Sequence, residues 1–241
     1  MNFEEIRSKN ILSTIKDEKS AVEFQKELNK FISIDNSLLP EKIETAAGVD
    51  LAYWIEDGTE YAVCCITVID FESKKIVENV HCVGKIEFPY IPGCLSFREL
   101  PLILETTKKL KQEPDLYVFD GNGYLHPRHM GIATHAAIYL KKPAIGVAKS
   151  YYKVYDTDFV MPDDKEGAYT DIVIKGEVYG RVLKTHKGVK PVFISAGNFI
   201  DLDTSTNIIK SLVTKESHIP VPTRLADLET HKMRNLYRNR K

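Results

Sequence analysis

The order of hydrophobic periodicities along the chain is the feature that most constrains its fold. Three consecutive segments rich in Val, Ile, Tyr and Cys, at Ala46–Tyr53, Glu60–Phe71 and Lys74–Ile86, are separated only by short polar turns. Such a run predicts a three-stranded antiparallel meander. After Gly93 the apolar spacing becomes helical and a strand–helix–strand pattern follows, which predicts parallel strands joined by a crossover.

The remaining elements follow from the same periodicities, and no internal repeat or low-complexity linker interrupts them. The chain of 241 residues is therefore predicted to form one α/β domain over residues 1–241, with a central mixed sheet flanked by helices. Its basic end, residues 231–241, is interpreted as a flexible tail, with contact to a phosphate backbone as the alternative. The other predicted elements are helices at Ala21–Phe31, after Ser96, at Ile132–Leu140, at Thr204–Val213 and after Pro222, strands at Asp115–Asp120, Pro143–Ala148 and Pro191–Ser195, and a hairpin over Asp171–Leu183.

Composition excludes several classes of protein. Lys and Arg number 33 against 34 Asp and Glu, which excludes a polybasic DNA-coating protein but not an enzyme that gathers its positive charge on one face. No apolar run approaches the roughly 20 residues of a membrane helix, and the charged N-terminal segment lacks the apolar core of a signal peptide. The four cysteines include no CxxC pair, so neither a disulfide framework nor a cysteine zinc site is indicated. We expect a cytoplasmic protein without membrane association, and a nuclear location stays open.

Two aspartates occupy otherwise apolar segments. Asp50 lies within AAGVDLAY, and Asp120 ends LYVFD. Burying an unpaired carboxylate is costly, so each needs a cation, several hydrogen bonds or solvent. If the strands at Ala46–Tyr53 and Asp115–Asp120 are neighbours, the two carboxylates lie close together and repel each other unless a divalent ion separates them. Oxygen ligands of this kind suit Mg²⁺, with Mn²⁺ as a substitute, better than zinc.

Six segments occur in the order AAGVDLAY, PYIPGCLSFRELP, DGNGYLHPRHMGIATH, IGVAKS, GVKPVFISAG and VPTRLAD. Together they run from Ala46 to Asp227, and they resemble endonuclease V, the deoxyinosine 3′-endonuclease family. The resemblance implies a ribonuclease H-like fold and a Mg²⁺-dependent repair enzyme that hydrolyses the second phosphodiester bond 3′ to deoxyinosine (hypoxanthine) in DNA. Some members of the family prefer inosine in single-stranded RNA.

The resemblance also assigns the metal-binding acids. They fall on Asp50, Glu99 and Asp120, with Asp227 at a further position that differs among relatives between His and Asp. Glu99 also lies three residues after Ser96, which is the spacing of a helix capping box. The string SFRE after PYIPG favours the metal role for Glu99 over the capping role.

Lys149 and His126 are the predicted contacts to the scissile phosphate. Lys149 directly follows the strand Pro143–Ala148 and would act as a point charge, the alternative being a solvated surface lysine. His126 follows Asp120 after a short glycine-containing loop. The histidines of HPRHMGIATH also allow a zinc cluster, which we consider weaker because no established ligand spacing is present; His135 is interpreted as a helix histidine without a chemical role.

The PYIPG segment predicts a rigid loop. Pro92 restricts the backbone and Gly93 permits a tight turn, while Tyr90 and Ile91 offer apolar surface. The resemblance assigns this loop the role of a wedge that enters the duplex at the damaged base, with Tyr90 as its main residue. The alternative is an ordinary turn whose Tyr90 packs on the core.

Gly121, Asn122 and Gly123 are predicted to form part of a pocket for the everted base. Glycines let backbone groups approach a base closely, so that its edges distinguish hypoxanthine from adenine and guanine. A dinucleotide-binding turn fails, because the position of its third glycine holds His126.

A magnesium-dependent DNA repair endonuclease is therefore the predicted function, with deoxyinosine-containing DNA as its partner. An endoribonuclease acting on inosine-containing RNA and a non-catalytic module that binds deaminated bases remain alternatives. Ser195–Asn198 has the sequence Ser-Ala-Gly-Asn where the family commonly has Ser-Pro-Gly-His, which leaves the chemistry of that segment open.

Overall fold

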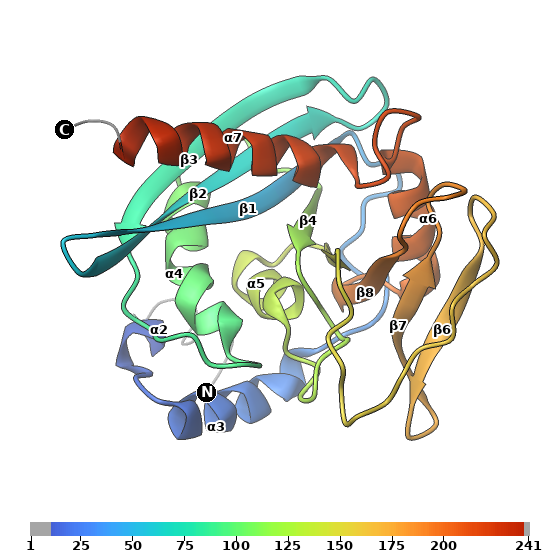
Figure 1. Ribbon diagram of the computed structural model, residues 1–241, viewed down its shortest axis with the longest axis horizontal. Helices are drawn as coiled ribbons and strands as arrows, with labels where there is room; N and C mark the ends of the chain where they lie inside the picture. The colour runs from blue at the N-terminus through green and yellow to red at the C-terminus, as the bar shows by residue number, and fades with distance from the viewer. Residues whose placement is uncertain (1–10, 239–241) are drawn as a thin grey trace.

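The computed structural model describes residues 11–238, which build an eight-stranded mixed sheet covered by helices (Figure 1). The strand order is β3-β2-β1-β4-β5-β8-β7-β6. The strands are β1 Thr45–Glu56, β2 Thr59–Asp70, β3 Ile76–Lys85, β4 Leu116–Asp120, β5 Ala144–Ala148, β6 Tyr169–Ile174, β7 Glu177–Leu183 and β8 Val192–Asn198. The helices are α2 Ile11–Thr14, α3 Glu18–Leu28, the 3₁₀ turn η1 Asn29–Phe31, α4 Leu95–Thr107, α5 Ile132–Leu140, α6 Leu202–Leu212 and α7 Val221–Arg238.

The predicted fold class is confirmed. Strands β1, β2 and β3 form the antiparallel meander, and β4 and β5 join β1 in parallel. Both crossover connections that parallel pairing requires contain helices, α4 before β4 and α5 between β4 and β5. The predicted hairpin is β6–β7, whose turn contains Gly176 with a φ of +85°.

Each face of the sheet is buried under different helices. Alternate residues of β1 and β2 point to opposite faces, so Cys64 joins the core under α4 and α5, whereas Cys65 packs beneath α7 beside Met233. Figure 1 shows α7 crossing β1 and β2 on the side opposite α4 and α5. A site formed between these strands and α7 therefore draws on residues far apart in the sequence.

The C-terminal end differs from its prediction. Helix α7 continues to Arg238, and Met233 is buried against β1 and β2, so residues 231–238 are helical rather than a flexible tail. Residues 239–241 of that predicted tail lie outside the described part of the chain, as do residues 1–10 of the N-terminal segment. No helix within residues 11–238 is long and apolar enough to cross a membrane.

Candidate active site

The parallel pairing of β1 with β4 brings Asp50 and Asp120 together. Val49 lies opposite Phe119 in this pairing, and the next residue on each strand is the aspartate. The condition under which the two carboxylates were expected to lie close together, that their strands are neighbours, is thus met. Asp227, from the second turn of α7, completes an acidic cluster whose three residues each offer a carboxylate oxygen within 4.8 Å of the others.

Glu99 faces this acidic cluster without belonging to the close group of three carboxylates. Its Oε1 accepts a hydrogen bond of 2.5 Å from the hydroxyl of Tyr53 on β1. Burial raises the pKa of Glu99 to about 7, and the charges of Asp50 and Asp120 add to this effect. The repulsion from Asp50 and Asp120 shows that Glu99 senses the charge of the cluster, although Glu99 is not one of its three close carboxylates.

The predicted capping box of α4 is wrong. The helix begins at Leu95 with Cys94 as its N-cap, so Ser96 lies inside the first turn. The buried Ser96 hydroxyl is instead 2.7 Å from Nδ1 of His135 on α5. A tertiary partner has overridden the local spacing, and Glu99 is left free of a capping role.

Lys149 and Thr230 contact the acidic cluster directly. The ammonium group of Lys149 lies 2.6 Å from Oδ2 of Asp120 and 3.4 Å from Oδ1 of Asp227. Burial disfavours its charged form, but the hydrogen bond and charge of Asp120 outweigh this and raise the pKa of Lys149. The Thr230 hydroxyl lies 2.9 Å from Oδ2 of Asp50 and 2.7 Å from the backbone carbonyl oxygen of Asp227. Lys149 is therefore a charged neighbour of the acids rather than an isolated surface lysine.

The acidic cluster fits a hard divalent cation. Its donors are all carboxylate oxygens, the ligand type that Mg²⁺ and Mn²⁺ prefer. Burial, and to a lesser extent repulsion from Asp120, raises the pKa of Asp50 to about 6. Ionisation of all three carboxyl groups is therefore unfavourable when no cation is bound. One ammonium group against three carboxylates leaves net negative charge that a cation would neutralise.

In the metal-free protein, the Asp50 carboxyl is expected to make folding less favourable as pH rises from about 4 to about 6. Its pKa is raised from 3.8 to about 6, so between these values the folded chain binds more protons than the unfolded chain. The stability present below pH 4 is then lost through pH 6, and a two-unit shift corresponds to about 3 kcal/mol at most. Urea denaturation in chelator should show a steeper decline for wild type than for Asp50→Asn, and parallel profiles would contradict this.

The predicted wedge is exposed and borders a cavity. Tyr90 is 72% exposed, which excludes the alternative in which it packs on the core. A cavity of about 120 Å³ lies beside it, lined by Tyr90 to Gly93, the start of α4, the segment around Asn122 and Met130, and Tyr152. The Asn122 side-chain oxygen is buried and has no hydrogen-bond partner among residues 11–238. A small cavity lined by Asn122 therefore adjoins an exposed aromatic side chain.

Comparison with known proteins decides the family. The family model described as Endonuclease V matches residues 26–228. A relative named Endonuclease V from Bacillus thuringiensis subsp. konkukian is 57% identical over 227 residues, covering 93% of this chain and 97% of the relative. The chain belongs to the endonuclease V family. It is therefore a nuclease of the metal-dependent, phosphodiester-hydrolysing type.

Solved structures of endonuclease V share this fold. The Bacillus subtilis enzyme matches with a TM-score of 0.90 and 54% identity, covering 94% of this chain and 96% of its own. The Ciona intestinalis enzyme matches with a TM-score of 0.80 and 26% identity, covering 91% and 100%, and was solved with a 24mer DNA containing an inosine followed by a ribo-adenosine. The ribonuclease H-like expectation thus agrees with the fold of solved family members.

The two predicted pocket glycines do not present free amides to a base. The Gly123 N–H donates to the Ser195 hydroxyl at 2.8 Å, and the Gly121 N–H donates to the Val147 carbonyl at 3.2 Å. A Cβ on Gly123 would lie 2.2 Å from a carbonyl oxygen of β8, so glycine permits close packing there. Of the three predicted residues, only Asn122 lines the cavity.

The three histidines of the weaker zinc interpretation point in different directions. His126 lies against the Gly93 carbonyl, His129 stacks on Tyr124 with ring centroids 3.9 Å apart, and His135 contacts Ser96. Within residues 11–238 the only group of three potential metal ligands is the acidic cluster. His135 is fully buried, in agreement with its interpretation as a packed helix residue.

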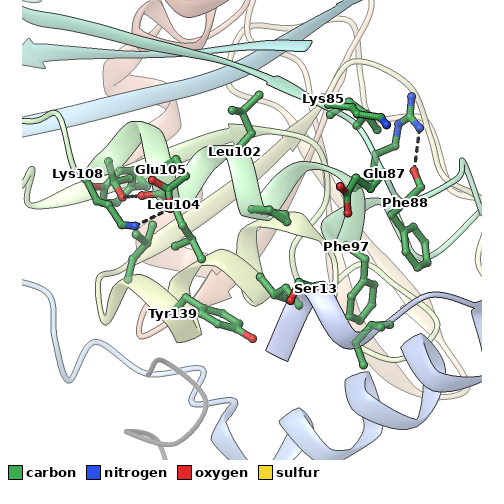
Figure 2. A pocket seen from close by; sticks show the side chains of 18 of the residues that line it. Ser13, Lys85, Glu87, Phe88, Phe97, Leu102, Leu104, Glu105, Lys108 and Tyr139 are labelled. Carbon is green, nitrogen blue, oxygen red and sulfur yellow. Dashed lines mark hydrogen bonds and ion pairs between the residues drawn. The ribbon is translucent and has the colours of Figure 1, made fainter. Parts of the chain in front are cut away.

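A larger cavity lies away from the predicted site residues. It measures about 540 Å³ and is bounded by α2, α4, α5 and the end of β3, as Figure 2 shows. Leu102, Phe97 and Tyr139 line it, together with charged residues such as Lys85. None of the predicted site residues lines it, so the smaller cavity beside Tyr90 remains the candidate for the base.

The sequence did not indicate three residues whose side chains form hydrogen bonds with the predicted site residues. Tyr53 binds Glu99, Thr230 binds Asp50, and Ser195 binds the Gly123 amide. Thr230 lies three residues after Asp227, which puts both on one face of α7, so helical spacing could have signalled it. Ser195 belongs to the segment with the unusual Ser-Ala-Gly-Asn sequence, which forms the end of β8 rather than a loop.

Proposed function

We propose that this chain repairs DNA by hydrolysing the second phosphodiester bond 3′ to deoxyinosine. The observation that carries the proposal is the acidic cluster on an endonuclease V fold, with Lys149 at its edge. The exposed Tyr90 lines a cavity together with Asn122, which lies two residues after Asp120 in the chain. The Ciona intestinalis relative, crystallised with inosine-containing DNA, supports the choice of lesion. Because relatives above 50% identity are bacterial proteins, we place this activity in the cytoplasm, where bacterial DNA lies.

The metal of this reaction is proposed to be Mg²⁺, with Mn²⁺ as a substitute. Asp50, Asp120 and Asp227 would hold it, with Glu99 as a further ligand. When bound, such a cation polarises the phosphate and makes a water molecule more acidic. Thr230 orients the Asp50 carboxylate by its hydrogen bond, and Tyr53 does the same for Glu99.

Lys149 is proposed to bind the scissile phosphate. Its side chain is 41% exposed and its ammonium group contacts both Asp120 and Asp227, so it can donate to a phosphate oxygen beside the acids. Such a positive charge stabilises the negative charge that develops during phosphodiester hydrolysis. His126 is buried, with both ring nitrogens in hydrogen-bond contact with backbone groups, and we therefore assign it to the support of the lesion-binding loop.

Recognition of the base is proposed to rest on Tyr90 and Asn122. Tyr90, with Ile91 and Pro92, would occupy the space left when the lesion leaves the duplex. The unsatisfied Asn122 oxygen would accept the N1–H of hypoxanthine. Adenine has no hydrogen on N1, so it would not make this hydrogen bond, whose net contribution is about 0.5–1.5 kcal/mol.

An oligonucleotide assay tests substrate and metal together. Matched 5′-labelled strands carrying deoxyinosine in DNA, inosine in RNA, or deoxyadenosine in DNA are incubated with Mg²⁺ or with chelator. We expect one product, cut at the second bond 3′ to deoxyinosine, that requires Mg²⁺ and is absent with deoxyadenosine. Preferential cleavage of the RNA would instead make this an inosine-specific endoribonuclease, since only RNA offers the 2′-hydroxyl. Tight binding without any product would favour the non-catalytic alternative.

A further inference from the structure

The carbonyl oxygen of Gly93 contacts three side-chain nitrogens at once. Gln25 Nε2 lies 3.0 Å away, His126 Nε2 lies 3.0 Å away, and Arg128 Nη2 lies 2.8 Å away. A carbonyl oxygen has two lone pairs. Three contacts from side chains of different segments therefore exceed the number needed to satisfy its hydrogen-bonding capacity. Gln25 belongs to α3, whereas His126 and Arg128 belong to the segment between β4 and α5.

The three side chains are also bonded to one another or to the same short segment. Gln25 Oε1 accepts from Nε of Arg128 at 2.6 Å, and Gln25 is fully buried. His126 Nδ1 accepts from the backbone N–H groups of Arg128 and Met130, so the ring proton lies on Nε2 and points to Gly93. Burial agrees with this neutral form, because it lowers the pKa of His126 to about 3.

Gly93 lies where the wedge, helix α4 and the small cavity meet. It follows the wedge residues Tyr90 to Pro92, it adopts a φ of +77°, and it precedes α4, which carries Glu99. It also lines the small cavity, together with His126. A Cβ on Gly93 would lie 2.8 Å from Nη2 of Arg128, so the contacts depend on glycine at this position. Fixing this carbonyl fixes the angle at which the wedge leaves the helix.

We propose that Gln25, His126 and Arg128 form a clamp on the Gly93 carbonyl that holds the wedge over the base pocket and thereby sets the affinity for the lesion. The proposal rests on the proposed function of the wedge and pocket. Gln25 and Arg128 are positioning residues, since they act through Gly93 and lie behind it. Holding the loop in its bound conformation reduces the ordering cost of DNA binding. Loss of the clamp should therefore weaken binding, with little effect on hydrolysis once the complex has formed.

Two variants remove different parts of the clamp. Gln25→Leu keeps the size of the side chain but removes its three polar contacts, to the carbonyls of Gly93 and Met130 and to Arg128. Arg128→Lys keeps the charge but loses the planar fork that bonds Gln25 and Gly93 together. The matched control is Gln112→Leu, because Gln112 is exposed and lies beyond α4. Tyr90→Ala provides the reference for complete loss of the wedge side chain.

Three measurements are made on the full-length protein. They are the Kd for a deoxyinosine duplex in chelator, the single-turnover cleavage rate at saturating enzyme with Mg²⁺, and the hydrogen-exchange rate of peptides covering residues 88–96 without DNA. For Gln25→Leu and Arg128→Lys we expect a Kd raised about tenfold, the size expected for loss of a hydrogen bond to a charged group. The saturated rate should stay within about twofold of wild type, and exchange in residues 88–96 should be faster.

A double-mutant cycle tests whether the clamp affects the Kd through the wedge. If the clamp acts through Tyr90, adding Gln25→Leu to Tyr90→Ala should raise the Kd little beyond Tyr90→Ala alone. Additive losses would overturn the proposal, as would a lowered Tm with unchanged Kd and unchanged exchange in residues 88–96, which a merely structural role predicts. If Gln25→Leu fails to fold, Arg128→Lys carries the same test. If the wild-type protein neither bound nor cleaved deoxyinosine-containing DNA, the proposed function would be overturned. The hydrogen-exchange rates of residues 88–96 would still decide whether the clamp holds the loop.

Discussion

Replacing Asp50 or Asp120 with asparagine is expected to lower cleavage of a deoxyinosine strand by about a thousandfold or more, with the fold retained. Each substitution removes a charged oxygen ligand from the acidic cluster while preserving side-chain size. Single-turnover kinetics with saturating Mg²⁺ measures the loss. Thermal denaturation in chelator should show an unchanged or higher Tm for Asp50→Asn, because the buried carboxylate is destabilising when no cation balances it.

The control for this prediction is Asp163→Asn, which removes one negative charge from an exposed position outside the site. Its cleavage rate should equal that of wild type. If Asp50→Asn or Asp120→Asn cleaved at the wild-type rate, that residue would not be a metal ligand of the reaction. If instead the variants lost both activity and fold, the carboxylates would be structural, which their mutual repulsion argues against.

The sequence could place Asp50 beside Asp120, provided that their strands are neighbours, because each aspartate is recognisable within its own apolar strand. An acid within one apolar strand and an acid at the end of another meet as soon as those strands are parallel neighbours. The change from period two to helical spacing was enough to predict the meander and the crossover. Asp227 came from the resemblance alone, because its place in the cluster depends on how α7 crosses the sheet.

Where the sequence failed, a distant partner had changed the meaning of a local pattern. Ser96 and Glu99 have the spacing of a capping box, yet His135 binds the serine and Tyr53 binds the glutamate. The clamp is a stronger example, since Gln25 lies 68 residues from Gly93 in the chain. No periodicity relates a buried glutamine of α3 to a turn before α4, and only the packed structure brings them together.

Gly48 shows how closely the fold must pack to place Asp227. It lies within β1, where glycine is ordinarily unfavourable and its presence indicates close approach of another backbone. An added Cβ would lie 2.0 Å from the Pro222 carbonyl oxygen and 2.5 Å from the Thr223 amide nitrogen. The first turn of α7 therefore rests directly on the strand that carries Asp50, and this contact sets the position of the turn that carries Asp227.

Gly48→Ala is therefore expected to destabilise the protein by about 3 kcal/mol or more, since neither backbone can yield as a side chain could. Displacement of α7 should also move Asp227 and Thr230, and Mg²⁺ should then stabilise the variant less than wild type. Urea denaturation with and without Mg²⁺ measures both effects.

The matched control is Gly84→Ala in β3, where the atoms nearest to the added Cβ would belong to the Leu102 side chain, the first of them a methyl carbon 2.9 Å away. That side chain can rotate, so we expect a loss below about 1 kcal/mol and full stabilisation by Mg²⁺. Equal losses for the two variants would mean that α7 yields as easily as one leucine side chain. The strand–helix contact at Gly48 would then not be what positions the third carboxylate, and Asp227 would owe its place to the hydrogen bonds around Asp50 and Lys149 instead.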